Sequence, residues 1–167
     1  MAMVCSADAA QGVGAQGVGA QGVGAQRVGD ESTPKGKVYV YKQVDGVNRE
    51  MEIFFPKGKQ NDKKLVAGII LFPGGGWGGG SRQAFRYQCD YFASRAMVAA
   101  TVTYRLRTKE DRAALTDGQS TKRVCIPDVK SAIRWFKQHA QELGVDPNRI
   151  VAGGGSAGVT SACWARP

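Results

Sequence analysis

From Lys35 onward, short apolar runs alternate with polar segments, and the length of each run indicates the element it forms. Two runs rich in β-branched and aromatic residues, 37–43 and 47–55, flank Asp45-Gly46, a dipeptide typical of hairpin turns. Three later runs have the length of strands buried on both faces, and they cover 65–72, 97–104 and 149–153. The pattern therefore predicts a hairpin followed by three buried strands.

Two helices are predicted between the buried strands. The first follows Ser81, a residue suited to a helix N-terminus, and runs to about Arg95. The second begins near Pro127 and Asp128, which favour a first turn, and stops at Gly144. Apolar residues keep helical spacing along it: Val129, Ala132, Ile133, Phe136, Ala140 and Leu143. We expect a basic loop from the end of the 97–104 strand to Arg123, and a turn at 146–148.

The order of these elements, β-β-β-α-β-α-β, predicts an α/β fold. We expect a mostly parallel sheet with helices on both faces and an antiparallel hairpin at its start. Residues 10–29 instead repeat the pentapeptide Ala-Gln-Gly-Val-Gly with one late variation, and one Val in five cannot offset the ordering entropy of so many glycines. We therefore predict a disordered low-complexity segment over 1–34 and one folded domain over 35–167.

Charge and cysteine content exclude several classes of protein. The net charge is +9, but Lys and Arg are spread over many short groups, which favours a solvated surface and no nucleic-acid partner. The single His and the absence of a Cys-x-x-Cys pair argue against a metal site, and the sequence leaves a Cys89–Cys125 bridge open. No apolar run approaches the length of a membrane span. Met1–Ala10 has an Ala-rich stretch like a signal-cleavage site but no basic start, so the compartment, cytoplasmic or secreted, stays open.

The sharpest chemical signal is Gly154-x-Ser156-x-Gly158, placed between a buried strand and a predicted helix. A serine on such a tight turn holds its hydroxyl above the sheet, where a base can reach it. Glycines flank the serine because side chains would clash where strand and helix pass close together. Ser156 is therefore the candidate nucleophile.

A glycine run at Gly74–Gly80 follows the first buried strand. Acyl transfer builds negative charge on a carbonyl oxygen, and backbone N–H groups aimed at that oxygen stabilise it. We expect Gly75 and Gly76 to donate these N–H groups, together with Ala157, which stands at a helix start. No organic cofactor and no metal are needed for this chemistry.

Four ordered motifs carry a resemblance to a known family: Pro73-Gly74-Gly75-Gly76-Trp77, Thr103-Tyr104-Arg105-Leu106, Asp146-Pro147-Asn148-Arg149-Ile150 and Gly155-Ser156-Ala157-Gly158. Over residues 35–158 the chain resembles esterases and lipases of the α/β-hydrolase superfamily, in the hormone-sensitive-lipase-like and acetyl-xylan-esterase-like branch. The resemblance implies a serine-dependent carboxylic ester hydrolase with a Ser–Asp/Glu–His triad, small-molecule ester substrates and no cofactor.

The chain departs from that family in three ways. Pro73 stands where the family's oxyanion motif usually opens with His, and the residues after Gly158 do not follow the family's usual pattern. The family's acid and base come after the serine, yet no Asp, Glu or His follows Ser156, and a catalytic role for His139, expected to face solvent, is not favoured. We therefore expect the front portion of such a domain, ending just after the nucleophile turn and having little esterase activity by itself.

Two other classes of protein remain open from the residues alone. Gly74-x-Gly76-x-x-Gly79 formally matches a dinucleotide-binding fingerprint, although the following strand ends without the acidic residue that would hold a ribose. A basic, non-catalytic interaction protein is the second alternative, and steeply salt-dependent binding to a polyanion would favour it.

Overall fold

A mixed sheet of five strands, in the order β1-β2-β4-β3-β5, forms the centre of the molecule. The structure is a computed structural model that describes residues 33–57, 64–113, 124–158 and 162. Its strands are β1 (Lys37–Val44), β2 (Val47–Phe54), β3 (Val66–Phe72), β4 (Val98–Val102) and β5 (Val145–Gly154). Strand β2 pairs antiparallel with β1 and β4, whereas β3 runs parallel to both β4 and β5. The predicted α/β class, the opening hairpin and the parallel central strands are confirmed.

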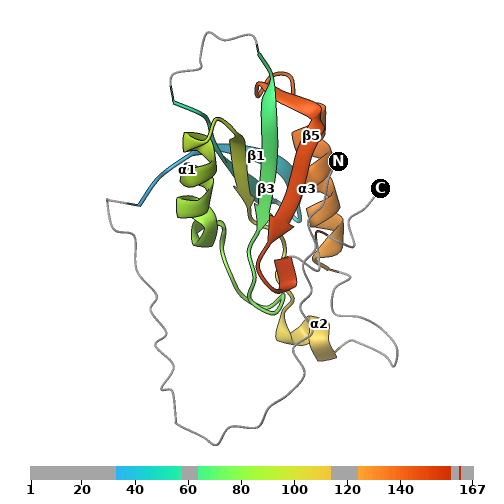
Figure 1. Cartoon of the computed structure of the whole chain (residues 1–167). Coiled ribbons are helices and arrows are strands. Elements are labelled where there is room, and N and C mark those ends of the chain that lie inside the picture. The colour runs from blue at the N-terminus through green and yellow to red at the C-terminus, as the bar shows by residue number, and fades with distance from the viewer. Residues whose placement is uncertain (1–32, 58–63, 114–123, 159–161, 163–167) are drawn as a thin grey trace, which may run out of the picture.

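Helices cover both faces of this sheet, as predicted (Figure 1). On one face α1 (Arg86–Ser94) packs over β4 and β2 and closes a small core that includes Cys89, Ala93 and Leu71. On the other face α3 (Ile126–Gln138) covers a larger core that includes Phe136, Ile70 and Phe72. Strand β4 is buried along its whole length because a helix lies over each of its faces.

The helices differ from the prediction at their ends and in number. The first begins as a 3₁₀ turn, η1 (Arg82–Phe85), and Ser81 precedes it without a capping hydrogen bond from its side chain. Helix α3 ends at Gln138, earlier than predicted, and turns lead from there to Gly144. The expected basic loop contains a short helix, α2 (Lys109–Ala113). Thr108 and Asp111 cap it reciprocally, and this Thr-x-x-Asp pattern is a signal that could have revealed it.

Strand β5 starts four residues before the predicted strand and includes the expected turn. Val145 pairs with Val66 and Ile150 with Gly68, so the residues between them form an irregularity in the ladder. The Asp146 carboxylate accepts a 2.9 Å hydrogen bond from the Asn148 N–H, which is a local turn inside the strand. The turn chemistry was recognised correctly, but the strand continues through it.

Three further expectations concern the cysteines, membrane spans and the repeat segment. Cys89 and Cys125 are free thiols buried in different cores, so the bridge left open by the sequence is not formed. Within the described ranges, no helix is long and apolar enough to cross a membrane. The repeat segment expected to be disordered lies almost entirely outside the described residues.

Candidate active site

Strand β5 ends at the same end of the sheet as its parallel neighbour β3 (Figure 1). Ser156 lies on a sharp turn directly after β5. Its φ angle is +48°, in the left-handed region that non-glycine residues rarely adopt, and its side chain is exposed. Holding a serine there costs about 1–3 kcal/mol, which surrounding structure must offset. Ala157 and Gly158 then begin a helical turn. The turn therefore presents the Ser156 hydroxyl above the sheet.

The carbonyl of Phe72, the last residue of β3, holds this turn in place. It accepts a 3.2 Å hydrogen bond from the Gly155 N–H, and the Gly155 carbonyl accepts a 2.8 Å bond from the Gly158 N–H. A Cβ at Gly154 would lie 2.2 Å from the Phe72 oxygen, and one at Gly158 only 1.9 Å from it. Both flanking glycines are thus required by close approach, as the sequence pattern suggested.

The glycine loop continues directly from the same strand end. Gly75 and Gly76 have φ angles of +123° and +59° and are exposed. The loop is closed by a 3.2 Å hydrogen bond from the Gly78 N–H to the Gly75 carbonyl and by a 2.7 Å bond from the Arg107 N–H to the Trp77 carbonyl. In the described part of the chain, the Gly75 and Gly76 N–H groups donate to no protein acceptor. They are therefore available to an external oxygen.

The loop and the serine turn are in contact. A Cβ built on Gly74 would lie 2.8 Å from the Gly155 carbonyl oxygen and 3.4 Å from the Ser156 Cβ. The structure thus places the first residue of the loop against the serine turn. Gly75 and Gly76 follow Gly74 in the chain, and Ala157 follows Ser156.

A buried tyrosine holds the first residue of the loop. The Tyr104 hydroxyl donates a 2.5 Å hydrogen bond to the Pro73 carbonyl. Burial, aided by the nearby Cys125, raises the pKa of Tyr104 to about 12, so this hydroxyl keeps its proton at neutral pH. Sequence reasoning noted Tyr104 only within a motif and gave it no role, because its partner lies 31 residues away.

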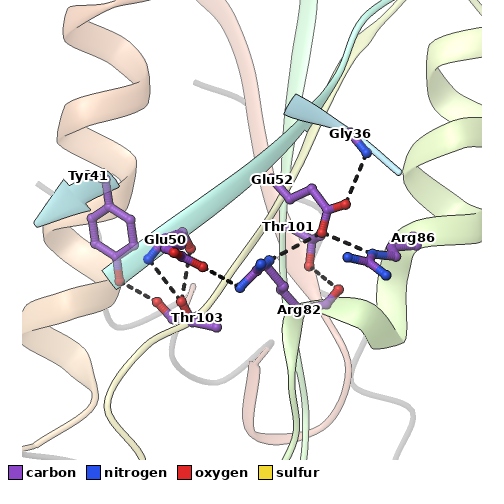
Figure 2. Close-up of polar contacts among 8 residues, drawn as sticks. All are labelled: Gly36, Tyr41, Glu50, Glu52, Arg82, Arg86, Thr101 and Thr103. Atoms are coloured by element: carbon purple, nitrogen blue, oxygen red, sulfur yellow. Dashed lines mark hydrogen bonds and ion pairs between the residues drawn. The ribbon is translucent and has the colours of Figure 1, made fainter. Parts of the chain in front are cut away.

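An ion cluster fixes the far end of the loop. Glu52 on β2 is buried and accepts hydrogen bonds from Arg82 at 3.2 Å and from Arg86 at 3.0 Å, and its other oxygen accepts from the Gly36 N–H (Figure 2). Arg82 also pairs with Glu50 at 2.7 Å. Because Arg82 and Arg86 begin η1 and α1, the cluster holds the segment after Gly80 against the sheet. Removing one partner of such a buried cluster typically costs about 3–5 kcal/mol.

A second buried carboxylate ties the segment after β4 to α3. Asp128, fully buried at the start of α3, accepts hydrogen bonds from the Arg105 side chain, the Arg105 N–H and Lys42. Burial alone would raise the pKa of Asp128, but these donors outweigh it and hold the pKa below its usual value. Arg105 directly follows Tyr104, so this cluster also steadies the tyrosine.

His139 does not belong to this site. Its ring stacks on Trp135 with centroids 4.2 Å apart, and its Nδ1 lies 2.8 Å from the Trp135 carbonyl oxygen. It is half-buried against α3, so the expectation that it faces solvent was wrong. No described Asp, Glu or His hydrogen-bonds to Ser156, and the described residues hold no cluster of three metal-ligating side chains.

A glycine-lined serine turn after the third parallel strand, against a glycine loop after the first, defines an α/β-hydrolase. A family model described as BD-FAE matches residues 51–165, and the chain belongs to this family of α/β-hydrolase esterases. The family assignment favours the hydrolase over the nucleotide-binding and non-catalytic alternatives.

Individual relatives agree with this assignment. A thermophilic esterase from Thermogutta terrifontis, in its propionate-bound structure, is 44% identical with a TM-score of 0.67, covering 78% of this chain and 45% of that one. The apo form of the same esterase gives a TM-score of 0.65 at 44% identity, covering 78% and 45%. Arylacetamide deacetylase from Bos taurus is 33% identical over 113 residues, which are 65% of this chain and 25% of the relative. The chain thus spans less than half the length of these relatives.

Proposed function

We propose that this chain carries the nucleophile and the oxyanion-stabilising groups of a serine-dependent carboxylic ester hydrolase. Ser156 attacks the carbonyl carbon of a small-molecule ester, and the N–H groups of Gly75, Gly76 and Ala157 receive the negative charge that develops on the carbonyl oxygen. The bond between the carbonyl carbon and the alcohol oxygen then breaks, and the alcohol leaves with the proton of the Ser156 hydroxyl. Water hydrolyses the acyl group on the Ser156 oxygen, which releases the acid and restores the hydroxyl. The contact between Gly74 and Ser156 is the observation that carries this proposal.

The roles of the two structural supports follow from this chemistry. Electrostatic stabilisation depends on donors that are already in position when charge develops. Tyr104 holds the loop before Gly74, and the Glu52 cluster holds it after Gly80. Both act as positioning residues, because the Tyr104 hydroxyl is bonded to the Pro73 carbonyl and the Glu52 carboxylate to its two arginines.

The proposal is tested best by covalent labelling, because labelling reports attack by Ser156 itself and does not require the later release of an acid. No described Asp, Glu or His hydrogen-bonds to Ser156, so the readout is covalent labelling and not turnover of an ester. A fluorophosphonate probe should modify Ser156, identified by mass spectrometry of the labelled peptide, and Ser156→Ala should abolish the modification.

Ser131→Ala is the matched control, since Ser131 is a serine on α3 whose hydroxyl donates to the Pro127 carbonyl. It should label like the wild-type chain. Labelling that persists in Ser156→Ala at the wild-type rate would show that another nucleophile reacts and would contradict the assignment of Ser156.

A further inference from the structure

A cavity of about 280 Å³ lies beside the glycine loop, and the proposed acyl transfer does not use it. Its lining comes from the glycine loop, from the end of β4 and the residues after it, and from β2: Pro73, Gly80, Ser81, Val102, Thr103, Tyr104, Leu106 and Arg49. Ser156 does not line this cavity, so the inference stands independently of the proposed function.

Arg49 is the unusual member of this lining. Its Nε–H is buried and donates to no acceptor among the described residues. Buried donors are almost always paired, so an orphaned one within a functional protein needs an explanation. Lys42 lies directly opposite Arg49 in the hairpin register, which places two positive charges side by side.

The neighbouring positively charged side chains each pair with a carboxylate. Lys42 and Arg105 share the carboxylate of Asp128, and Arg82 and Arg86 share that of Glu52. Arg49 has no acidic partner in the described ranges, although it lies between these two clusters in the sheet. Its guanidinium is therefore free to receive an anion from outside the chain.

The rest of the lining indicates which anion fits. The Tyr104 hydroxyl is already donated to Pro73, and the Thr103 hydroxyl is bonded to the backbone of Glu50. Val102, Leu106 and the Pro73 ring offer apolar contact, and the exposed Ser81 offers one hydroxyl. A planar carboxylate can accept two parallel hydrogen bonds from one guanidinium, whereas a phosphate would leave charged oxygens against apolar walls.

We propose that this cavity binds a small aliphatic carboxylate. The carboxylate accepts from the Arg49 Nε–H and a terminal N–H of the same guanidinium, and the short carbon chain lies against Val102 and Leu106. Recognition thus combines two parallel hydrogen bonds between the guanidinium and the carboxylate with a few methylene contacts. Interactions of this number and kind correspond to millimolar affinity.

The test is a titration of the 167-residue chain with butyrate, followed by NMR of the arginine Nε–H resonances. The Arg49 resonance, assigned by its disappearance in Arg49→Lys, should shift saturably. Butyramide, which has nearly the same shape without the charge, should bind at least about tenfold more weakly, since hydrogen bonds to charged groups are the stronger ones. Butyrate should bind Ser156→Ala as well as the wild-type chain, which separates this site from the proposed active site.

Arg49→Gln should weaken butyrate binding by about tenfold or more, measured by calorimetry. Arg134→Gln is the matched control, because it removes the same charge from an exposed position on α3 and should leave binding unchanged. Leu106→Trp keeps the Arg49 guanidinium but narrows the cavity, so it should also weaken butyrate binding. This variant provides the test if Arg49→Gln does not fold. An Arg49 resonance that does not respond to butyrate, equal binding of butyramide, tighter binding of inorganic phosphate, or unchanged affinity in Arg49→Gln would each overturn the proposal.

Discussion

The hydroxyl of Tyr104 donates to the carbonyl of Pro73 at 2.5 Å, and this bond joins the end of β4 to the start of the glycine loop. The two residues are buried, so the loss of this donor would leave a buried carbonyl unpaired. Because Pro73 directly precedes Gly74, the bond bears on the position of the proposed oxyanion donors.

Tyr104→Phe removes this hydroxyl without changing the ring. We expect the free energy of unfolding to fall by about 1–2 kcal/mol, because a buried carbonyl loses its donor. Fluorophosphonate labelling of Ser156 should also slow several-fold, measured as a rate under native conditions. Tyr87→Phe, at an exposed position on α1, serves as the control and should change neither quantity. An unaltered labelling rate in Tyr104→Phe would refute the positioning role.

Gly158→Ala tests the close approach of the serine turn to β3. The added Cβ would lie 1.9 Å from the Phe72 oxygen and 2.9 Å from the Pro73 oxygen, and backbone atoms cannot rotate away. We expect a loss of about 3 kcal/mol or more in urea unfolding. Gly46→Ala is the contrast: its φ is +73° but nothing lies within 4 Å of the added carbon, so only about 1 kcal/mol of backbone strain applies. Equal losses in the two variants would show that the contact with Phe72 is not tight.

Ser156→Gly should stabilise the chain relative to Ser156→Ala. Both substitutions remove the hydroxyl, but only glycine accepts the φ of +48° without strain. The expected difference in the free energy of unfolding is about 1 kcal/mol. Chemical denaturation of the two variants measures it directly. Identical stabilities would mean that the turn relaxes in solution and does not hold the serine in the left-handed region.

Asp128→Asn should change how stability depends on pH. The pKa of Asp128 in the folded chain lies below the ordinary carboxyl value of 3.8. Its ionised form therefore contributes its full stabilisation above pH 3.8, and this contribution is lost as the pH falls through the folded pKa. We expect the variant to lose about 3 kcal/mol at neutral pH, because Arg105 and Lys42 lose their shared acceptor.

The variant should also lose less stability than the wild-type chain when both are acidified below pH 3.8, since its side chain no longer titrates. Thermal unfolding over a pH series measures both effects. Asp45→Asn, in the exposed hairpin turn, removes the same charge and should preserve the acid response of the wild-type chain. A steeper acid response in Asp128→Asn would contradict the direction of the pKa shift.

Local signals predicted most of the fold. The length of the apolar runs placed β3, β4 and β5, because a strand buried on both faces has few polar positions to interrupt it. The β-rich runs on either side of Asp45-Gly46 placed β1 and β2. The α2 helix was not predicted, because its short, charged sequence has no apolar periodicity. Thr108 and Asp111 do carry a capping pattern. The predicted end of α3 was too late because the apolar spacing continues through the turns that lead to Gly144.

The candidate site was predictable only in part. Glycine spacing pointed to Ser156 and the loop at Gly74–Gly80, because turns with positive φ angles select glycine. The ion clusters that hold the loop and its neighbours have no comparable sequence pattern. Arg86 meets Glu52 across 34 positions and Arg105 meets Asp128 across 23, and neither pair has any periodic relation in the sequence. The same holds for the orphaned Nε–H of Arg49, which only the packing around it reveals.

The Phe72 carbonyl holds the serine turn, and the chain continues from Phe72 into the loop that carries the proposed oxyanion donors. The proposed nucleophile and the proposed donors therefore depend on the same strand end, and we expect a displacement of β3 to move them together. Sequence change in the surrounding walls can then alter which acyl and alcohol groups are accepted while the reacting geometry stays the same. In evolutionary terms, this one strand end would let substrate preference diversify without redesign of the chemical step.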